Sequence, residues 1–370
     1  MKQNEENINK IVKKPVVLVA PLDWGLGHAT RCIPIIHALT RNGAQVLLAG
    51  EGPVEILLKN EFPKLPLLPL KGYQVSYSKS KAGFFPKLVM QSPRLLGMVE
   101  YEHKWLIRTI KSRQLDAVIS DNRFGLWTRN IPCVYLTHQL HIHSPNMALS
   151  LLAQKVHYKF INRFSECWVP DLEINGLAGK LSHPAQLPET AVKYVGPLSR
   201  LQKIETKKTI DVFASLSGPE PQRSIFEKIL VPQLKRSGKK VVFLRGLPGE
   251  TKTSYADTDD FKIYNHLPAK KFNEMLQKAK LVIARAGYST VMDLAAVAQK
   301  AILVPTPGQS EQEYLAKYLQ EQNLFMAAGQ DNFILEEELR KMEQFSFAEP
   351  LKTDDGLLDA VVKDFVERLR

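Results

Sequence analysis

The sequence predicts an α/β fold with two Rossmann-like domains, each built on a parallel sheet, that face each other across a cleft. Short apolar runs alternate with segments of helical periodicity, as βαβ units require. The length of 370 residues is sufficient for two domains. The break at Gly196-Pro197 and the polar stretch 202–209 separate two such alternating series. We therefore expect a first domain over 1–197, a second over 198–350, and a C-terminal helix, 351–370, that crosses back to the first domain.

The first domain begins with a clear βαβ pattern. A helix is expected over Thr30–Leu39 with Pro34 in its first turn, where proline is tolerated, and a longer helix over 146–165. The apolar runs that predict strands in this half lie at 15–20, 45–49, 67–70, 116–120, 133–137 and 167–170.

The turn after the first strand has two possible meanings. It contains Gly25 and Gly27, but the dinucleotide fingerprint G-x-G-x-x-G fails because Thr30 stands at the third glycine position. Glu51 follows the second strand, where a carboxylate can hold a ribose. An NAD-dependent oxidoreductase therefore remains an alternative, although the histidine at position 28 is foreign to that fingerprint.

The second domain repeats the alternation of strands and helices. Helices are expected over 222–234, 288–297, 336–345 and 354–369, and a further helix is expected to begin with Ser310 as its N-cap. The runs that predict strands lie at 210–214, 240–244, 261–264, 281–284 and 301–304.

The stretch Leu281–Gln312 organises this second half. It reads strand, turn, helix, strand, turn, helix, so both turns lie at the carboxyl ends of their strands. Ligands bind at that edge of an open parallel sheet because helix N-termini present free N–H groups there. Asp293 lies two turns into the first of these helices, where a carboxylate can accept hydrogen bonds from a ribose diol.

The residues of this stretch carry a family resemblance. Residues 285–293, 304–305 and 309–312 resemble the donor-sugar signature of GT-B glycosyltransferases, and most closely the family 28-like group of the lipid-II-forming UDP-N-acetylglucosamine transferase. In that family an acid holds the ribose of UDP and a glutamine holds the donor sugar. The resemblance places these roles on Asp293 and Gln312. The family acid is usually Glu, so Asp293 is one methylene shorter.

The same resemblance implies the rest of a donor site. Arg285 is expected beside the diphosphate, with a structural ion pair as the alternative. The family cradles the diphosphate in a glycine-rich turn, and here that turn has a single glycine. The other donor-site candidates are Ser217, Gly218, His266, Ala286, Gly287, Thr290 and Gln309.

Related enzymes place a Gly-His turn after the first strand, facing the cleft. His28 occupies this position and suits the general base that an inverting transferase needs, because histidine titrates near neutrality. Asp121 ends the strand 116–120, as does the aspartate that orients the histidine in plant-type UDP-glycosyltransferases. The alternatives are helix capping for His28 and capping of Arg123 for Asp121. Gly25, Gly27, Arg123 and His138 are expected on the acceptor side of the cleft.

No metal or other cofactor is expected. His138, His141 and His143 lie close together, but no acid or cysteine completes a metal shell near them, so acceptor contact or neutral hydrogen bonding is favoured. The acidic run 257–260 contains D-x-D without a nucleotide-site context and is interpreted as a solvated turn. GT-B enzymes generally stabilise the leaving diphosphate with helix N-termini and basic groups. The UDP-sugar is then a substrate.

The net charge of +12 permits an anionic partner, such as a nucleotide diphosphate or an anionic membrane. Nucleic acid is not expected, since no binding motif is present. Segment 72–113 mixes Lys79, Lys81, Lys87 and Arg94 with apolar residues, which suits an anionic membrane or a lipid-linked acceptor; a pair of amphipathic helices packed on the sheet is the alternative.

The expected location is the cytoplasm, with peripheral association at the inner face of a membrane. No run of 18 apolar residues is present, and the polar N-terminus lacks the features of a secretory signal. Cys32, Cys133 and Cys167 are expected to be buried free thiols in a reducing compartment.

The sequence thus predicts an inverting, metal-independent glycosyltransferase. It would move a hexose or N-acetylhexosamine from a UDP-sugar to a hydroxyl acceptor, lipid-linked or soluble, in cell-envelope or polysaccharide synthesis. A nucleotide-sugar epimerase and a non-catalytic sugar-nucleotide-binding subunit are the alternatives within the fold.

Overall fold

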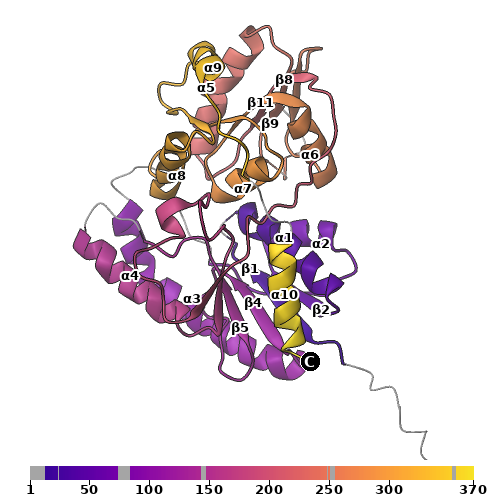
Figure 1. Cartoon of the computed structure of the whole chain (residues 1–370), viewed down its shortest axis with the longest axis vertical. Coiled ribbons are helices and arrows are strands. Elements are labelled where there is room, and N and C mark those ends of the chain that lie inside the picture. The colour runs from indigo at the N-terminus through magenta and orange to yellow at the C-terminus, as the bar shows by residue number, and fades with distance from the viewer. Residues whose placement is uncertain are drawn as a thin grey trace, which may run out of the picture.

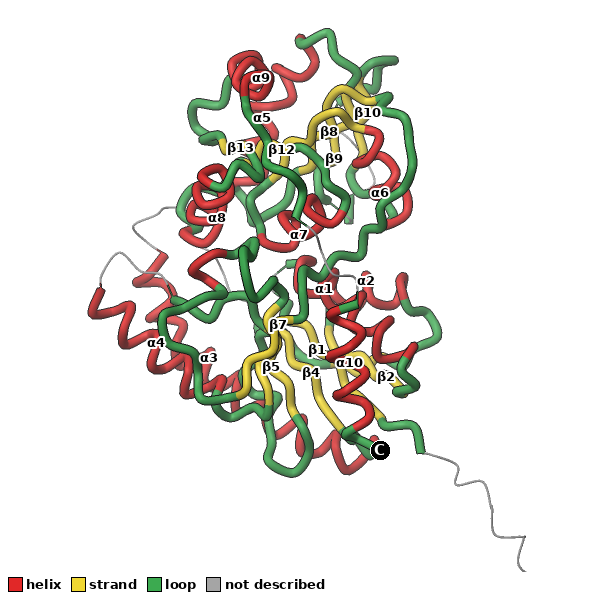
Figure 2. The backbone as a smooth tube through the Cα atoms, in the orientation of Figure 1, coloured by secondary structure: helices red, strands yellow, loops and turns green. Residues whose placement is uncertain are grey.

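The chain forms two α/β halves arranged along the long axis of the molecule (Figure 1). The computed structural model describes residues 13–23, 25–73, 84–142, 147–247, 249–250, 255–351 and 356–370. Lys79, Lys81 and His143 of the sequence analysis lie outside these ranges. Each half contains a parallel sheet with helices packed around it (Figure 2), which confirms the predicted α/β class.

The first sheet has seven strands in the order β3-β2-β1-β4-β5-β6-β7, all parallel. Its strands are β1 (Val16–Pro21), β2 (Gln45–Gly50), β3 (Leu67–Pro69), β4 (Ala117–Asp121), β5 (Cys133–Leu136), β6 (Glu166–Val169) and β7 (Ala191–Tyr194). The helices of this half are α1 (Leu26–Arg41), α2 (Gly52–Glu61), α3 (Phe84–Arg113), α4 (Met147–Ile161) and the 3-10 turn η1 (Gly179–Leu181).

The second sheet has six parallel strands in the order β10-β9-β8-β11-β12-β13. These are β8 (Ile210–Ser215), β9 (Val241–Leu244), β10 (Phe261–Tyr264), β11 (Ala279–Ala284), β12 (Ala301–Leu303) and β13 (Met326–Ala327). The helices are α5 (Gln222–Arg236), α6 (Ala269–Lys278), α7 (Tyr288–Ala296), α8 (Ser310–Glu321), α9 (Leu335–Gln344) and α10 (Leu357–Glu367).

The central strands of both sheets are buried on both faces. Every residue of β1 and β4 is buried, as are most residues of β11. Continuous apolar runs such as VVLVA are typical of parallel strands covered on both sides, because no alternate residue needs to face water. This is why the sequence predicts these strands to within one or two residues.

Several elements differ from the sequence prediction. Helix α1 begins at Leu26 rather than Thr30, so His28 lies in its first turn and Pro34 lies in its interior. Helix α8 begins at Ser310, with Gln309 and not Ser310 as its N-cap. Residues 84–113 form one helix instead of a pair. The short strands β7 and β13 and the helix α2 were not predicted, because their apolar patterns are too short or too mixed to show a period. Helix α6 was not predicted either, although Phe272, Met275 and Leu276 have helical spacing.

Both sheets reverse their strand order next to the first strand of the half. In the first sheet this occurs between β1 and β4, and in the second between β8 and β11. The loops that leave such strands diverge to opposite faces and open a crevice at the carboxyl edge, where ligands bind in this class of fold. His28 follows β1 and Asp121 ends β4, so both lie at the first of these points.

The C-terminal helix α10 packs on the first half of the chain, beside α1 (Figure 1). Its Phe365 is 1% exposed and meets the ring of Trp168 edge-on at a centroid distance of 5.3 Å. Arg41 at the end of α1 pairs with Asp359 of α10 at 2.9 Å, and Arg370 donates to the carbonyl of Asn42 at 2.8 Å. The last helix therefore ties the end of the chain to the first sheet.

We expect Phe365→Ala to lower the free energy of unfolding by about 3–5 kcal/mol, because it leaves a cavity against Trp168. Chemical denaturation followed by tryptophan fluorescence measures the change. Ile174→Ala is the control, since that side chain is 76% exposed, and it should change stability by less than about 0.5 kcal/mol. Equal effects of the two substitutions would show that α10 contributes nothing to the stability of the first half.

Candidate active site

The centre of the candidate site is the first turn of α1. Gly25 precedes the helix with φ of 103°, a left-handed conformation that favours glycine, and brings the chain from β1 into α1. His28 then points back to the end of β4, with its Nδ1 3.0 Å from Oδ1 of Asp121. His28 lies in the helix that follows β1, and Asp121 ends the adjacent strand β4, so the structure brings together the two residues that were paired from the sequence.

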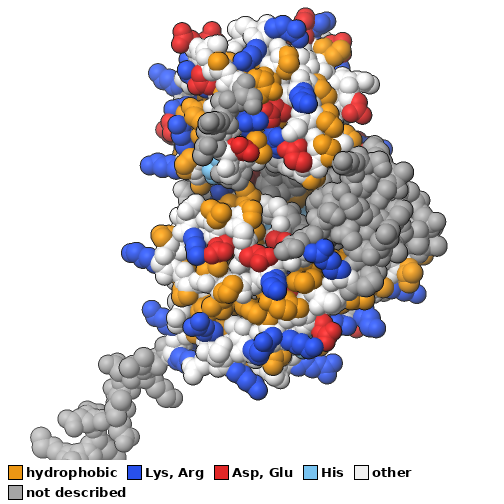
Figure 3. Space-filling model, turned by 180° about the vertical axis from the view of Figure 1, so that it is seen from behind, with side chains coloured by type: hydrophobic (Ala, Val, Ile, Leu, Met, Phe, Trp, Pro, Cys, Tyr) orange, Lys and Arg blue, Asp and Glu red, His pale blue; other side chains and the backbone are white. Residues whose placement is uncertain are grey.

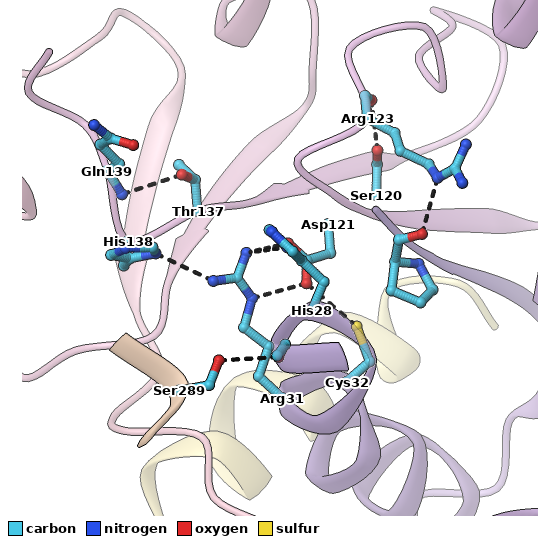
Figure 4. A network of polar contacts seen from close by, with 12 residues as sticks. His28, Arg31, Cys32, Ser120, Asp121, Arg123, Thr137, His138, Gln139 and Ser289 are labelled. Atoms are coloured by element: carbon cyan, nitrogen blue, oxygen red, sulfur yellow. Dashed lines mark hydrogen bonds and ion pairs between the residues drawn. The ribbon is translucent and has the colours of Figure 1, made fainter. Parts of the chain in front are cut away.

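Asp121 is fully buried and is also held by a cation. Arg31, three residues after His28, donates from Nε to Oδ2 of Asp121 at 2.7 Å and contacts Oδ1 through Nη2. Figure 4 shows the guanidinium group between Asp121 and His138, with His28 beside it. The side chain of His28 is 16% exposed, against 2% for Arg31, so the imidazole is the member of this trio that a ligand can reach.

The charges of the trio set its protonation states. Burial opposes ionisation of Asp121, but the charges of Arg31 and His28 and their hydrogen bonds hold the pKa of this carboxyl well below its usual range. Burial lowers the pKa of His28; the charge of Asp121 opposes this shift and that of Arg31 adds to it. A carboxylate beside a neutral imidazole is the state in which histidine can accept a proton.

His138 links this trio to the other half of the chain. Its Nδ1 lies 3.1 Å from Nη1 of Arg31, and its Nε2 lies 2.9 Å from Oε1 of Glu311 in α8. The ring stacks on Tyr288 of α7 with centroids 4.3 Å apart and planes 9° apart. His138 was expected in the cleft, and the structure places it between the two halves.

The two halves meet closely around this point. Ser289 of α7 donates to the carbonyl of Gly27 at 3.0 Å, and a Cβ on Gly27 would lie only 2.7 Å from the Ser289 hydroxyl oxygen. Tyr288 donates to the carbonyl of Pro170 at 2.8 Å. A side chain at position 27 would therefore displace the Ser289 hydroxyl from its hydrogen bond between α7 and α1.

A second contact joins α8 to the loop before η1. Tyr314 accepts from the backbone N–H of Lys180 at 2.7 Å, and Tyr318 donates to the carbonyl of Gly176 at 2.9 Å. The loop is held by buried Asp171, which accepts from the N–H groups of Leu177 and Ala178. Helix α8 is thus held by the first half at both Glu311 and its tyrosines.

The expected donor-site loops gather at the carboxyl edge of the second sheet. Ser217 and Gly218 are exposed in the turn after β8, and Gly218 has φ of 100°. A Cβ on Gly218 would lie 3.6 Å from Oγ1 of Thr306, in the loop after β12, so these two turns approach each other. The Thr306 hydroxyl is buried and has no hydrogen-bond partner among the residues that the structure describes.

The glutamines of the expected sugar site fold onto their own loop. Gln312 accepts from the N–H of Thr306 at 2.9 Å, and its amide donates to Gln309. Gly287 is the N-cap residue of α7, and a Cβ built on it would have no neighbouring atom within 4 Å among the described residues. Thr290 is partly buried, and Ala286 is buried. His266 is exposed at the end of β10, with its pKa lowered by partial burial and by the charge of Arg200.

Asp293 makes a contact that the sequence did not reveal. Ser199, in the segment that joins the two halves, donates to Oδ1 of Asp293 at 2.6 Å. Burial raises the pKa of Asp293 to about 6, although the Ser199 hydrogen bond and the charge of Arg200 act in the opposite direction. A ribose that binds this carboxylate must therefore share it with Ser199 or displace Ser199.

Arg285 is buried rather than presented to a ligand. It is 1% exposed, its Nη2 donates to Oε1 of Gln330 at 2.6 Å and to the carbonyl of Gln222 at 3.0 Å, and its guanidinium lies 4.6 Å from the ring of Phe226. Burial lowers its pKa to about 10. The expected alternative, a structural ion pair, is not made among the described residues either. Because it is buried, we expect Arg285 to act on a bound diphosphate only through its long-range charge and not through a direct contact.

The expectation that Arg123 lines the cleft is wrong. Its side chain is fully buried, pairs with buried Glu102 at 2.8 Å, and donates to the carbonyls of Pro21 and Lys71. Figure 4 shows it on the far side of Asp121, directed away from His28. A fully buried side chain with these partners holds the loops after β1, β3 and β4 together.

The acidic residues that the oxidoreductase and metal-binding alternatives depend on make structural hydrogen bonds instead. Glu51, the ribose ligand of the oxidoreductase reading, accepts from the N–H of Gly72 at 2.7 Å. Asp257 of the acidic run accepts from the N–H of Ile263 at 3.0 Å, as expected for a turn. Among the described residues, no cluster of His, Cys, Asp and Glu could hold a metal ion. The three cysteines are buried and free, as predicted.

Arg31 and Glu311 belong to the site through their contacts with Asp121 and His138, but they were not predicted from the sequence. A signal for Arg31 was present, since a charged residue at i+3 from His28 lies on the same face of an otherwise apolar helix. No local signal identified Glu311, because its partner is 173 residues away in the chain.

The surface carries charges of both signs. On the face shown in Figure 3, Lys and Arg side chains are spread over both halves and interspersed with Asp and Glu. This distribution differs from the basic stripe typical of nucleic-acid binding. Within the part of the chain that the structure describes, no helix combines the length and apolar character needed to cross a membrane.

Comparison with known proteins supports the family resemblance. Residues 228–368 match the model of the glycosyltransferase family 28 C-terminal domain. An uncharacterized glycosyltransferase of Methanosarcina mazei is 23% identical over 326 residues, covering 80% of this chain and 81% of the relative. The UDP-N-acetylglucosamine--N-acetylmuramyl-(pentapeptide) pyrophosphoryl-undecaprenol N-acetylglucosamine transferase of Bacillus licheniformis is 25% identical over 312 residues, with the same coverage of 80% and 81%.

Solved structures agree on the fold. The glycotransferase of kitacinnamycin superposes with a TM-score of 0.64 at 10% identity, covering 96% of this chain and 95% of that one. At this identity the likeness concerns the fold alone. The predicted GT-B fold and the resemblance to family 28 are confirmed.

Proposed function

We propose that this chain, a family 28-like glycosyltransferase of the GT-B type, transfers a hexose or N-acetylhexosamine from a UDP-sugar to a hydroxyl acceptor with inversion. The observation that carries the proposal is the His28–Asp121 pair, 3.0 Å apart at the switch point of the first sheet. It lies where the N-terminal turns of α7 and α8 reach the first half through Ser289 and Glu311.

His28 acts as the general base. Its Nδ1–H donates to Asp121, which leaves the Nε2 lone pair to accept the proton of the acceptor hydroxyl. The freed oxygen attacks the anomeric carbon from the face opposite the diphosphate, so the configuration inverts. Asp121 stabilises the imidazolium that forms.

The second half binds the donor. The N-termini of α7 and α8 and the Ser217-Gly218 turn offer N–H groups to the diphosphate, which stabilises the leaving group without a metal ion. Asp293 accepts hydrogen bonds from the ribose in exchange for Ser199, and Gln309 and Gln312 turn from each other to the sugar.

We further propose a lipid-linked acceptor at an anionic membrane, as in cell-envelope synthesis. The relative from Bacillus licheniformis is named for a pyrophosphoryl-undecaprenol acceptor. Helix α4 exposes one face that carries Leu151, Leu152 and Val156, which are 57%, 61% and 48% exposed, together with Lys155 and Lys159. Apolar side chains flanked by lysines suit insertion among anionic headgroups.

His28→Ala should lower kcat by about 100- to 10,000-fold with little change in KM for the donor, because it removes the base and leaves the second half intact. Transfer to a polyprenyl-linked or soluble hydroxyl acceptor is measured by release of UDP. His37→Ala is the matched control, an exposed histidine of the same helix, and should keep wild-type turnover. Undiminished activity of His28→Ala would remove His28 from the mechanism. Epimerised sugar formed without acceptor would instead support an epimerase.

UDP should bind the wild type, and Asp293→Ala should weaken binding at least tenfold. Because Asp293 has a pKa of about 6, wild-type affinity should fall as the pH drops through 6, where the carboxylate becomes protonated and accepts hydrogen bonds less well. Calorimetric titration measures both effects, with Asp331→Ala, an exposed acid of the same half, as the control. Binding that is indifferent to Asp293 would contradict the donor site, and a response to NAD instead would favour the oxidoreductase alternative.

Replacement of Leu151 and Leu152 by serine should reduce binding to vesicles that contain phosphatidylglycerol, measured by sedimentation, and should leave activity on a soluble acceptor unchanged. Ile174→Ser is the control, because that side chain is even more exposed, at 76%, but lies outside α4. Wild-type protein that ignores anionic vesicles, or a double variant that binds them normally, would contradict the membrane proposal.

A further inference from the structure

All three nitrogen atoms of the Arg31 guanidinium group contact neighbouring side chains. Nε and Nη2 face the two oxygens of Asp121, and Nη1 faces Nδ1 of His138 at 3.1 Å (Figure 4). A planar group held at two edges has a fixed orientation, and it fixes the carboxylate that it grips. Asp121 in turn determines the position of the imidazole of His28.

The hydrogen-bond partners of His138 determine which of its two ring nitrogens carries the proton. A guanidinium group can only donate, so Nδ1 of His138 must accept the hydrogen bond from Arg31. The proton of neutral His138 is therefore on Nε2, which donates to Oε1 of Glu311 at 2.9 Å. A continuous series of contacts thus runs from α8 through His138, Arg31 and Asp121 to His28.

Nδ1 of His28 lies 3.0 Å from Asp121 and 2.9 Å from Nη2 of Arg31. The carboxylate is the only acceptor of the two, so Nδ1–H points to Asp121 and the guanidinium lies beside the ring as a positive charge. Burial lowers the pKa of His28, the charge of Asp121 opposes this shift, and the charge of Arg31 adds to it, so Arg31 favours the basic form of the imidazole. The charged and titratable groups that act on His28 are Arg31 of α1, Asp121 of β4, His138 after β5 and Glu311 of α8, and the thiol of Cys32 in α1 contacts the same carboxylate of Asp121.

We propose that Arg31 is the positioning residue of the base His28, and that the contact between His138 and Glu311 makes this positioning depend on the second half of the chain. The inference rests on the proposed function, in which His28 is the base. Glu311 lies between Gln309 and Gln312, so the helix that carries the proposed sugar ligands also holds the far end of the series. The base is complete only when α8 is docked.

The Tyr288 ring supports this dependence. It lies against His138 at 4.3 Å and belongs to α7, which starts at the other donor loop. Movement of the second half away from the first would remove both Glu311 and Tyr288 from His138. His138 would then lose its fixed orientation, and Arg31 would lose the partner of Nη1.

The test is a ¹⁵N NMR titration of the histidine side chains, which needs no substrate. In the wild type, Nε2 of His28 should be unprotonated at neutral pH. In Arg31→Met, where the positive charge is absent, the pKa of His28 should rise by about one unit or more. Arg31→Lys keeps the charge without the fork and should give a smaller rise. Arg41→Lys, at the exposed end of the same helix, should leave His28 unchanged.

The coupling to α8 is tested by a pair of variants. Glu311→Ala removes the acceptor of His138 Nε2–H and should change the shifts and pKa of His28, whereas Glu311→Gln keeps an acceptor oxygen and should restore them. Glu321→Ala, at the exposed end of α8, is the control. In the acid limb of kcat/KM against pH, Arg31→Lys should move the midpoint upward.

An unchanged His28 titration in folded Arg31→Lys and Arg31→Met would overturn the positioning role. A His28 response to Arg31 but none to Glu311→Ala would overturn the coupling. Neither result depends on turnover. Failure of the proposed function would appear separately, as absence of sugar transfer by a protein whose His28 titrates as expected.

Discussion

The structure depends on one buried carboxylate, Asp121, which cannot remain ionised without a cation and hydrogen-bond donors close to it. Burying a charge costs several kcal/mol unless it is paired and hydrogen-bonded. Arg31 and His28 supply these partners from a single turn of α1. Because the carboxylate of Asp121 needs these partners, the N-terminus of α1 is held against the end of β4. This contact fixes the position of the His28 imidazole, the one partly exposed side chain of the three, at the junction between the two halves.

The junction combines polar contacts to backbone groups and aromatic stacking with apolar packing, since one buried apolar cluster includes residues of both halves, such as Cys32 and Met292. Ser289 and Tyr288 donate to carbonyls of the first half, and α8 is gripped through its tyrosines. Such contacts are numerous but individually modest, since each net hydrogen bond contributes about 0.5–1.5 kcal/mol. The apolar packing of α10 on the first half keeps the end of the chain in place.

Buried polar groups have two distinct uses in this molecule. Arg123 and Glu102, like Arg285 with Gln330, tie loops together beneath the surface and are closed to solvent. The series from His28 to Glu311 is instead open at both ends, where an imidazole and a carboxylate retain exposure of 16% and 33%. The difference explains why residue type alone did not separate the two uses. Arg31 and Arg123 are both buried and both pair with a buried carboxylate, but only the carboxylate that Arg31 holds also contacts a partly exposed side chain, His28.

Local composition was enough to predict the class of fold, the order of the long strands, the place of Asp121 at the end of a strand, and the places of His28 and Asp293 just after strands, because buried parallel strands and glycine turns depend on nearby residues. It did not determine β7 and β13, which form only because a neighbouring strand offers unpaired backbone groups at the sheet edge. The tertiary structure alone decided that Arg123 is buried, that Ser199 shares Asp293 and that Glu311 reaches His138. These contacts join residues 21 to 173 positions apart, and no local pattern specifies which side chain a distant one will meet.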